Sequence, residues 1–142
     1  MDEIDQRLLS MLAEDARQPA AMLARRLGLA RSTVQARIER LERTGMIAGY
    51  TLRPGPALQP ALRATVLISI EPRAGSAVLA RLKAMPEVES VHTTSGRVDL
   101  IASLAARDTE ELDAALERIG EARGVRGSES LIHLSTKFDR RR

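Results

Sequence analysis

The chain has 142 residues and a net charge of +3, with 44% hydrophobic and 29% charged residues, a composition typical of folded globular proteins rather than of disordered or collagen-like chains. It contains no cysteine, which excludes disulfides and thiolate metal sites and favours an intracellular, cytoplasmic location. No apolar run of about 18 residues is present and the start MDEIDQ is polar and acidic, so neither a membrane span nor a signal peptide is expected.

Arginine dominates the basic residues of the chain. Two of the 22 basic residues are lysines, Lys83 and Lys137, and the remaining 20 are arginines. Arginine makes bidentate contacts with phosphate and guanine, which favours a nucleic-acid ligand, although a GC-rich genome would produce the same bias through codon usage. The aromatic residues are one tyrosine and one phenylalanine. RNA-binding modules that stack bases on exposed aromatic side chains are therefore disfavoured.

Charge is unevenly distributed over the first part of the chain. Residues 1–24 hold two arginines against five acidic residues, whereas residues 25–43 hold six arginines against two glutamates. A basic segment therefore follows an acidic one within a region whose apolar spacing is helical.

Two helices are expected before residue 28. Asp2 is suited to cap the first helix, because apolar residues recur at helical spacing over residues 4–12. Pro19 suits the first turn of a second helix, and Gly28 suits the tight turn that ends it.

A third helix is expected over residues 31–43, followed by an extended segment over residues 46–52. Two short helices joined by a glycine turn, the second one basic, are typical of a helix-turn-helix domain, here with or without a wing. The alternative is an ordinary amphipathic helix with a solvated charged face. The inner face of the third helix would be Val34, Ile38 and Leu41, and the candidate DNA-binding residues are Arg31, Ser32, Thr33, Gln35, Ala36, Arg37, Arg40 and Arg43.

The second half of the chain has a different pattern. We expect a helix-turn-helix domain over residues 1–52, a proline-containing linker over residues 53–62 and a second domain over residues 63–142. In the second domain, alternating and helical spacings predict the order β-α-β-β-α-β, a ferredoxin-like arrangement, so the fold class is α+β. The elements are strands at 63–71, 88–94, 98–104 and within 125–137, and helices at 76–85, with Val78, Leu79 and Leu82 inward, and 108–119.

Four strands with helices on one face leave the other face of the sheet uncovered. Leu67, Val91 and Ile101 are expected on that face. Face-to-face dimerisation would bury these apolar side chains, so a homodimer is predicted.

Nothing in the sequence predicts an enzyme. The two histidines, His92 and His133, fall in expected strands without the spacing of a metal site, and structural roles are favoured for both. No phosphate-binding loop, dinucleotide fingerprint or nucleophile elbow is present, so no catalytic residue, metal or cofactor is predicted.

Several segments together resemble the Lrp/AsnC (feast/famine) transcription regulators. They are residues 4–9, 23–29 and 34–50 in the first half, and 85–88, 94–100 and 124–130 in the second. The resemblance covers nearly the whole chain. The run from Arg37 to Tyr50, combined with the Gly-x-x-Asp of residues 96–99, is more specific than either part alone.

The resemblance implies a regulator that binds double-stranded DNA as a homodimer, assembles further to an octamer, and responds to an amino acid or related metabolite that changes its assembly or its DNA affinity. Carried over to this chain, the effector-binding residues would be Gly96, Arg97, Asp99, Ser128 and Ser130. In such a site a carboxylate binds the ligand ammonium, and hydroxyl and backbone N–H groups bind its carboxylate.

Two positions depart from the family pattern, and two other functions remain open at this point. Ala30 stands where members often have a capping Ser, so Ser32 is an alternative cap for a helix that starts later, and Arg97 and Val98 replace an aromatic residue. Asp99 would then serve either the ligand or the hairpin turn. The alternative functions are a small-molecule-binding regulatory or enzymatic subunit with a vestigial DNA-binding domain, and an assembly scaffold that binds neither DNA nor metabolite.

Overall fold

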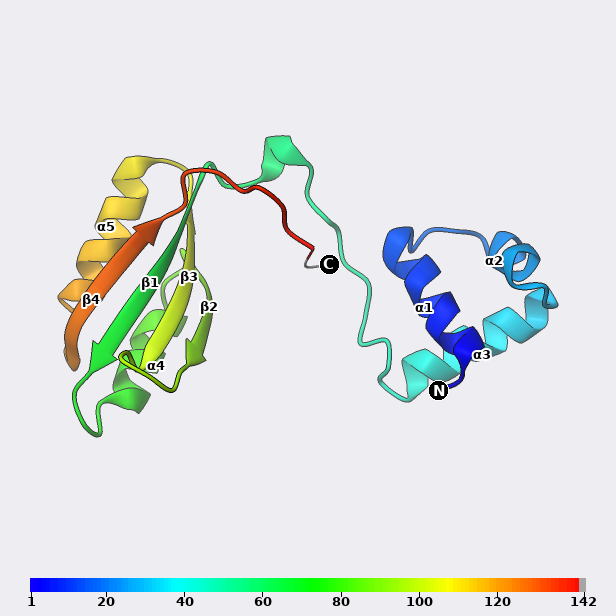
Figure 1. Ribbon diagram of the computed structural model, residues 1–142, viewed down its shortest axis with the longest axis horizontal. Coiled ribbons are helices and arrows are strands. Elements are labelled where there is room, and N and C mark those ends of the chain that lie inside the picture. The colour runs from blue at the N-terminus through cyan, green and yellow to red at the C-terminus, as the bar shows by residue number, and fades with distance from the viewer. Residues whose placement is uncertain (141–142) are drawn as a thin grey trace. The chain divides into compact units, whose positions relative to one another are not determined.

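A computed structural model describes residues 1–140, which form two compact units, Met1–Arg53 and Pro54–Asp139. Figure 1 shows a helical first unit and a second unit built on a sheet. Within the described residues, no helix is long and apolar enough to cross a membrane.

The first unit contains helices α1 (Glu3–Glu14), α2 (Ala20–Leu27) and α3 (Arg31–Arg43) (Figure 1). As predicted, Asp2 caps α1: its side chain accepts the backbone N–H of Asp5 at 2.8 Å, while the Asp5 carboxylate accepts the N–H of Asp2 at 3.4 Å, a reciprocal capping box. Apolar side chains from all three helices bury a shared core, namely Leu8, Met11, Leu12, Leu23, Ala24, Val34 and Leu41.

The turn between α2 and α3 uses the left-handed conformation that favours glycine. Gly28 has φ of 69° and ends α2. Leu29 then donates its N–H to the carbonyl of Ala24 at 2.9 Å. The third helix begins directly at Arg31 after Ala30, so Ser32 lies inside the first turn and does not cap a later start.

After α3 the chain has little regular structure before the second unit. Residues 46–52, expected to be extended, belong to no strand, and within residues 1–140 the first strand begins at Leu62. No β-wing is therefore present in the described part of the first unit. The expected linker contains one short 3₁₀ helix, Pro56–Leu58.

The second unit has the predicted ferredoxin-like order. Its elements are β1 (Leu62–Ile70), α4 (Gly75–Lys83), β2 (Val88–Thr93), β3 (Leu100–Ala106), α5 (Thr109–Gly120) and β4 (Val125–Ile132). The strands form one antiparallel sheet in the order β2-β3-β1-β4, and α4 and α5 cover one of its faces (Figure 1).

The covered face of the sheet holds the core of this unit. Side chains at alternate positions of β1 and β3 point into it, as the alternation predicted. On α4, Val78 and Leu82 are buried, but Leu79 is 40% exposed, contrary to the prediction. The inner face of this nine-residue helix is formed by Val78 and Leu82, which are one turn apart. Leu79 lies about 100° further round the helix than Val78.

The open face of the sheet carries Leu67 and Ile101, which pair across β1 and β3. The prediction that Val91 lies on this face is wrong. An irregularity between Val88 and Ser90 inserts one residue into β2, so Val91 pairs with Ala102 and packs against the helix-covered core. A bulge reverses the inside–outside alternation of the residues that follow it.

Candidate nucleic-acid interface and ligand site

Five side chains in the N-terminal half of α3 are exposed, and all five are residues predicted to contact DNA. Val34 is fully buried and Leu41 is 2% exposed, so these two residues attach α3 to the helical core. The outward positions are held rigidly as a result. They carry short polar, methyl and guanidinium groups, which can approach base edges and phosphates: Arg31, Ser32, Thr33, Gln35 and Ala36.

The start of α3 is also suited to an anion. Ala30 occupies the N-cap position, and no side chain of the described residues caps the helix there. The first-turn N–H groups and the Arg31 side chain therefore give this end of the helix a positive potential.

Arg37 and Arg40 behave differently from the other arginines of α3, because both contact the start of α1. The Nη1 group of Arg37 donates to Asp2 Oδ2 at 2.8 Å and to Asp5 Oδ1 at 2.9 Å. The Nη2 group of Arg40 donates to Asp5 Oδ2 at 2.6 Å. Both arginines are predicted DNA contacts, and the structure adds a protein partner for each.

These ion pairs change the acid–base properties of the cluster. Burial alone would raise the pKa of Asp5, but hydrogen bonds from Arg37 and from the Asp2 backbone, with the charge of Arg40, hold it below its ordinary value. The pKa of Asp2 is lowered by its hydrogen bonds with the Asp5 backbone and with Arg37. The pKa of Arg37 is raised by the same carboxylates. All of these groups are therefore charged at neutral pH.

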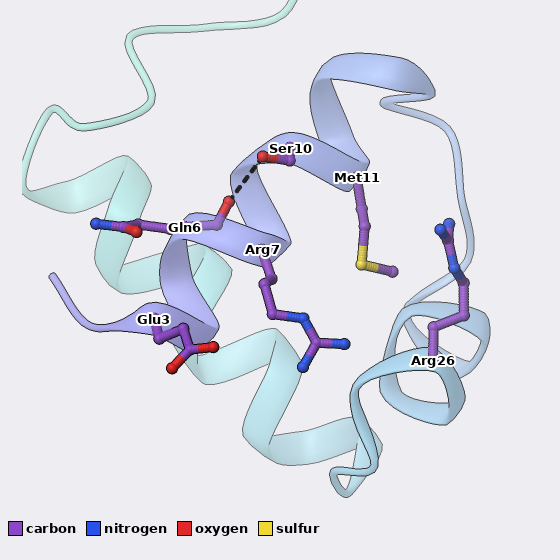
Figure 2. A pocket seen from close by; sticks show the side chains of 6 residues that line it. All are labelled: Glu3, Gln6, Arg7, Ser10, Met11 and Arg26. Atoms are coloured by element: carbon purple, nitrogen blue, oxygen red, sulfur yellow. Dashed lines mark hydrogen bonds between the residues drawn. The ribbon is translucent and has the colours of Figure 1, made fainter.

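Other arginines of the first unit have different surroundings. Arg43 is exposed at the end of α3. Arg26 of α2 donates to the side-chain oxygen of Gln18 at 3.0 Å. Arg7 of α1, which the sequence analysis did not single out, makes no hydrogen bond to the described residues; with Arg26 it lines a hollow between α1 and α2 (Figure 2) whose other residues are Glu3, Gln6, Ser10 and Met11.

The hairpin predicted to bind an effector is tied to the neighbouring strand through Asp99. One carboxylate oxygen of Asp99 accepts the N–H of Ile70 at 2.9 Å, and its own N–H donates to Ile68 at 3.0 Å. Asp99 therefore fixes the turn. Its side chain is exposed, and the other carboxylate oxygen has no hydrogen bond to the described residues, so this oxygen is open to a ligand.

The other predicted effector residues do not converge on Asp99. Arg97 donates to Glu129 at 3.2 Å, an acidic partner that the sequence analysis missed because it lies 32 residues away. Ser128 and Ser130 pair with Ile68 and Val66, so their side chains lie on the side of the sheet covered by helices. Gly96, with φ of 133°, forms the tip of the hairpin and leaves its backbone accessible.

His92 lies within β2, as predicted, whereas His133 follows the last residue of β4 and lies outside the strand. His133 lies 2.8 Å from the hydroxyl of Thr65, and His92 is exposed at β2. Across the described chain, no cluster of three histidine or acidic side chains could hold a metal ion.

Comparisons with known proteins agree for both units. The AsnC-type helix-turn-helix domain matches residues 1–42, and the Lrp/AsnC ligand binding domain matches residues 63–142. The HTH-type transcriptional regulator FL11 of Pyrococcus horikoshii is 32% identical over 137 residues, covering 96% of this chain and 91% of that protein.

Solved structures share the same fold. Escherichia coli AsnC superposes with a TM-score of 0.91 at 24% identity, covering 99% of this chain and 97% of that chain. A transcriptional regulator of Neisseria meningitidis, solved as a complex with L-Met, superposes with a TM-score of 0.90 at 24% identity, covering 98% and 93%.

Proposed function

Because the chain belongs to the Lrp/AsnC family of DNA-binding transcriptional regulators, we propose that it binds operator DNA through α3 and that a small metabolite bound to the second unit adjusts this binding. The observation that carries the proposal is the exposed N-terminal half of α3, held in place by the buried side chains of Val34 and Leu41. The FL11 relative, which is 32% identical to this chain, is named as a transcriptional regulator. This similarity favours a regulatory role over that of an enzymatic subunit.

Different side chains of α3 would have different roles at the DNA. Ser32, Thr33, Gln35 and Ala36 have the size and polarity to read base edges in the major groove. Arg31 and Arg43, both exposed, would bind phosphates, which contribute affinity rather than sequence preference. Arg37 and Arg40 are bonded to carboxylates at the start of α1, so any part they take in DNA binding depends on those ion pairs.

A second copy of the chain is the proposed partner of the open sheet face. Leu67 and Ile101 pair at its centre, and Leu131 of β4 is 47% exposed beside Thr65. Burial of this face would give a homodimer with two α3 helices for two DNA half-sites, and such dimers would combine into the octamer that the family resemblance implies.

The effector proposed for this chain is an amino acid or related metabolite bound at the rim near the β2–β3 hairpin. The open carboxylate oxygen of Asp99 can accept a ligand ammonium, and Arg97 can exchange Glu129 for a ligand carboxylate. A ligand that binds two assembly states unequally shifts their populations and thereby the spacing of the DNA-binding units. Ser128 and Ser130 would need a change in β4 to join this site.

Selection of genomic DNA fragments by the purified full chain tests the proposal. We expect enrichment of a common sequence, with binding that weakens steeply as salt increases. The selection is repeated with each of the twenty amino acids, and at least one should change the recovered fragments or their affinity. Absence of salt-dependent DNA binding would contradict the DNA-binding role, and absence of any amino-acid response would contradict an amino-acid effector. The protein is expected in the cytoplasm, where bacterial and archaeal DNA lies.

A further inference from the structure

Asp5 is unusual among the polar residues of this protein. Asp5 lies in the first turn of α1, and its side chain is 1% exposed. Among the described residues 1–140, it is the one charged or polar residue that is buried. A buried carboxylate is costly unless strong hydrogen bonds satisfy its oxygens. Here both oxygens are satisfied by arginines of α3, the helix proposed to read DNA.

Capping of α1 does not explain this arrangement. The Asp2 side chain already caps the helix through a 2.8 Å bond, whereas the backbone bond accepted by Asp5 is 3.4 Å long. The shorter bonds of Asp5, at 2.9 and 2.6 Å, reach Arg37 and Arg40, which are 32 and 35 residues away in the sequence. The principal partners of Asp5 are therefore on α3.

The two arginines are held in unequal ways. The Arg37 side chain is 21% exposed and its Nη1 group is shared by Asp2 and Asp5. The Arg40 side chain is 47% exposed and uses one nitrogen, Nη2, for Asp5. Its Nε and Nη1 groups donate to no acceptor in the described part of the chain, so they remain available to an outside ligand.

We propose that Asp5 is a positioning residue for DNA binding: its buried carboxylate holds the planar guanidinium of Arg40 so that the free N–H groups of Arg40 meet a DNA phosphate. Arg37 secures the other carboxylate oxygen and stays within the protein. A guanidinium fixed on one side loses less conformational entropy when it binds a phosphate on the other, which increases affinity. This inference rests on the proposed use of α3 for DNA.

The sign of one charge substitution separates this role from general electrostatics. Asp5→Asn keeps the size of the side chain and removes a negative charge beside α3. Attraction of DNA to net positive charge alone would then strengthen binding. If Asp5 positions Arg40, the same substitution weakens binding, because Arg40 loses its fixed orientation.

The experiment compares full-length wild type, Asp5→Asn, Arg40→Gln and the double variant on a duplex recovered by the genomic selection. Affinity is measured over a range of salt concentrations, with circular dichroism to confirm that each variant is folded. We expect Arg40→Gln to weaken binding by about tenfold and to lower the salt slope by about one phosphate contact. Asp5→Asn should weaken binding several-fold alone, by roughly 1 kcal/mol, and have no further effect in the Arg40→Gln background.

Arg7→Gln is the matched control. It removes one arginine charge from the same unit, but Arg7 lines the hollow between α1 and α2 (Figure 2). The arginines bonded to the Asp5 carboxylate are Arg37 and Arg40. Its effect on affinity should be less than about twofold, since charge at a distance is screened by salt. If Asp5→Asn does not fold, Arg40→Lys replaces it: a lysine keeps the charge but cannot bridge carboxylate and phosphate, so affinity should fall while the salt slope is retained.

Three results would overturn the inference. They are tighter or unchanged binding in Asp5→Asn, an additive loss in the double variant, and a wild-type affinity in the Arg40→Lys variant. A purely structural Asp5 would lower stability without this coupling to Arg40. Wild-type protein that shows no salt-dependent binding to any duplex would instead contradict the proposed function itself.

Discussion

Gly124 is the most closely packed glycine of the second unit. Replacing it with alanine should be strongly destabilising. Its φ is 95°, a conformation that alanine adopts at a cost of about 1–3 kcal/mol. A Cβ atom at this position would lie 2.7 Å from Ala74 Cβ and 3.2 Å from Val78 Cγ2. Relief of such a clash in a packed region costs about another 1–3 kcal/mol. The expected loss in the free energy of unfolding is therefore about 2–6 kcal/mol.

The carbonyl of Gly124 makes relief by movement difficult, because it accepts the N–H of Glu71 at 2.8 Å and so ties the residue before β4 to the residue after β1. Gly120→Ala is the matched control. It lies at the end of α5, where the nearest atom to an added Cβ is Ser128 Oγ at 3.9 Å, so it should be neutral or stabilising by up to about 1 kcal/mol. Urea unfolding followed by circular dichroism measures both variants. A loss below about 0.5 kcal/mol for Gly124→Ala would refute the reasoning.

Three further outcomes follow from other parts of the molecule. Ile101→Glu should dissociate the proposed dimer in light scattering, because an unpaired buried charge costs about 3–5 kcal/mol, whereas Ala114→Glu on the exposed side of α5 should leave it intact. Because folding lowers the pKa of Asp5, this carboxylate stabilises the fold fully above its ordinary pKa of 3.8, and the stabilisation is lost as the pH falls through the lower pKa of the folded state. The Asp5→Asn variant should therefore be less stable at pH 7, and its acid unfolding followed by circular dichroism should depend less on pH. Asp99→Asn keeps an acceptor for the Ile70 N–H but removes the charge. Calorimetric titration should therefore show an amino-acid affinity reduced about tenfold or more, with dimerisation unchanged. Equal affinity in the variant and the wild type would make Asp99 a turn residue alone.

Much of the fold was predictable because the burial pattern repeats locally. Val34 and Leu41 mark the inner face of α3 at helical spacing, and the alternation from Ala64 to Ile68 marks the covered face of β1. The prediction failed at Val91, because the side of the sheet on which a β2 residue lies depends on its register with β3. One inserted residue changes that register without leaving a periodic signal in β2 itself.

The candidate sites could be proposed from the sequence as segments but not as sets of contacts. The spacing of α3 correctly separated inward from outward positions, yet it could not show that Arg37 and Arg40 contact carboxylates more than 30 residues away. In the same way, residues 96–99 suggested a ligand site, but the bond from Ile70 to Asp99 depends on how the hairpin meets β1. Such pairings are set by tertiary packing, which a single sequence does not encode as a local pattern.

The charge pattern of the first unit takes on a different meaning once these contacts are known. The acidic segment before residue 25 and the basic segment after it look like separate features of the sequence, with the second offered to DNA. In the folded unit, part of the basic charge is neutralised by Asp2 and Asp5, so the net positive charge of α3 overstates its attraction for phosphate. The same ion pairs keep the guanidinium groups of Arg37 and Arg40 in place. The long-range attraction between α3 and DNA is therefore weaker, but the short-range geometry of these groups is defined. A phosphate contact of defined geometry fixes the register and orientation of a regulator on the duplex, and the side chains that read base edges depend on that register.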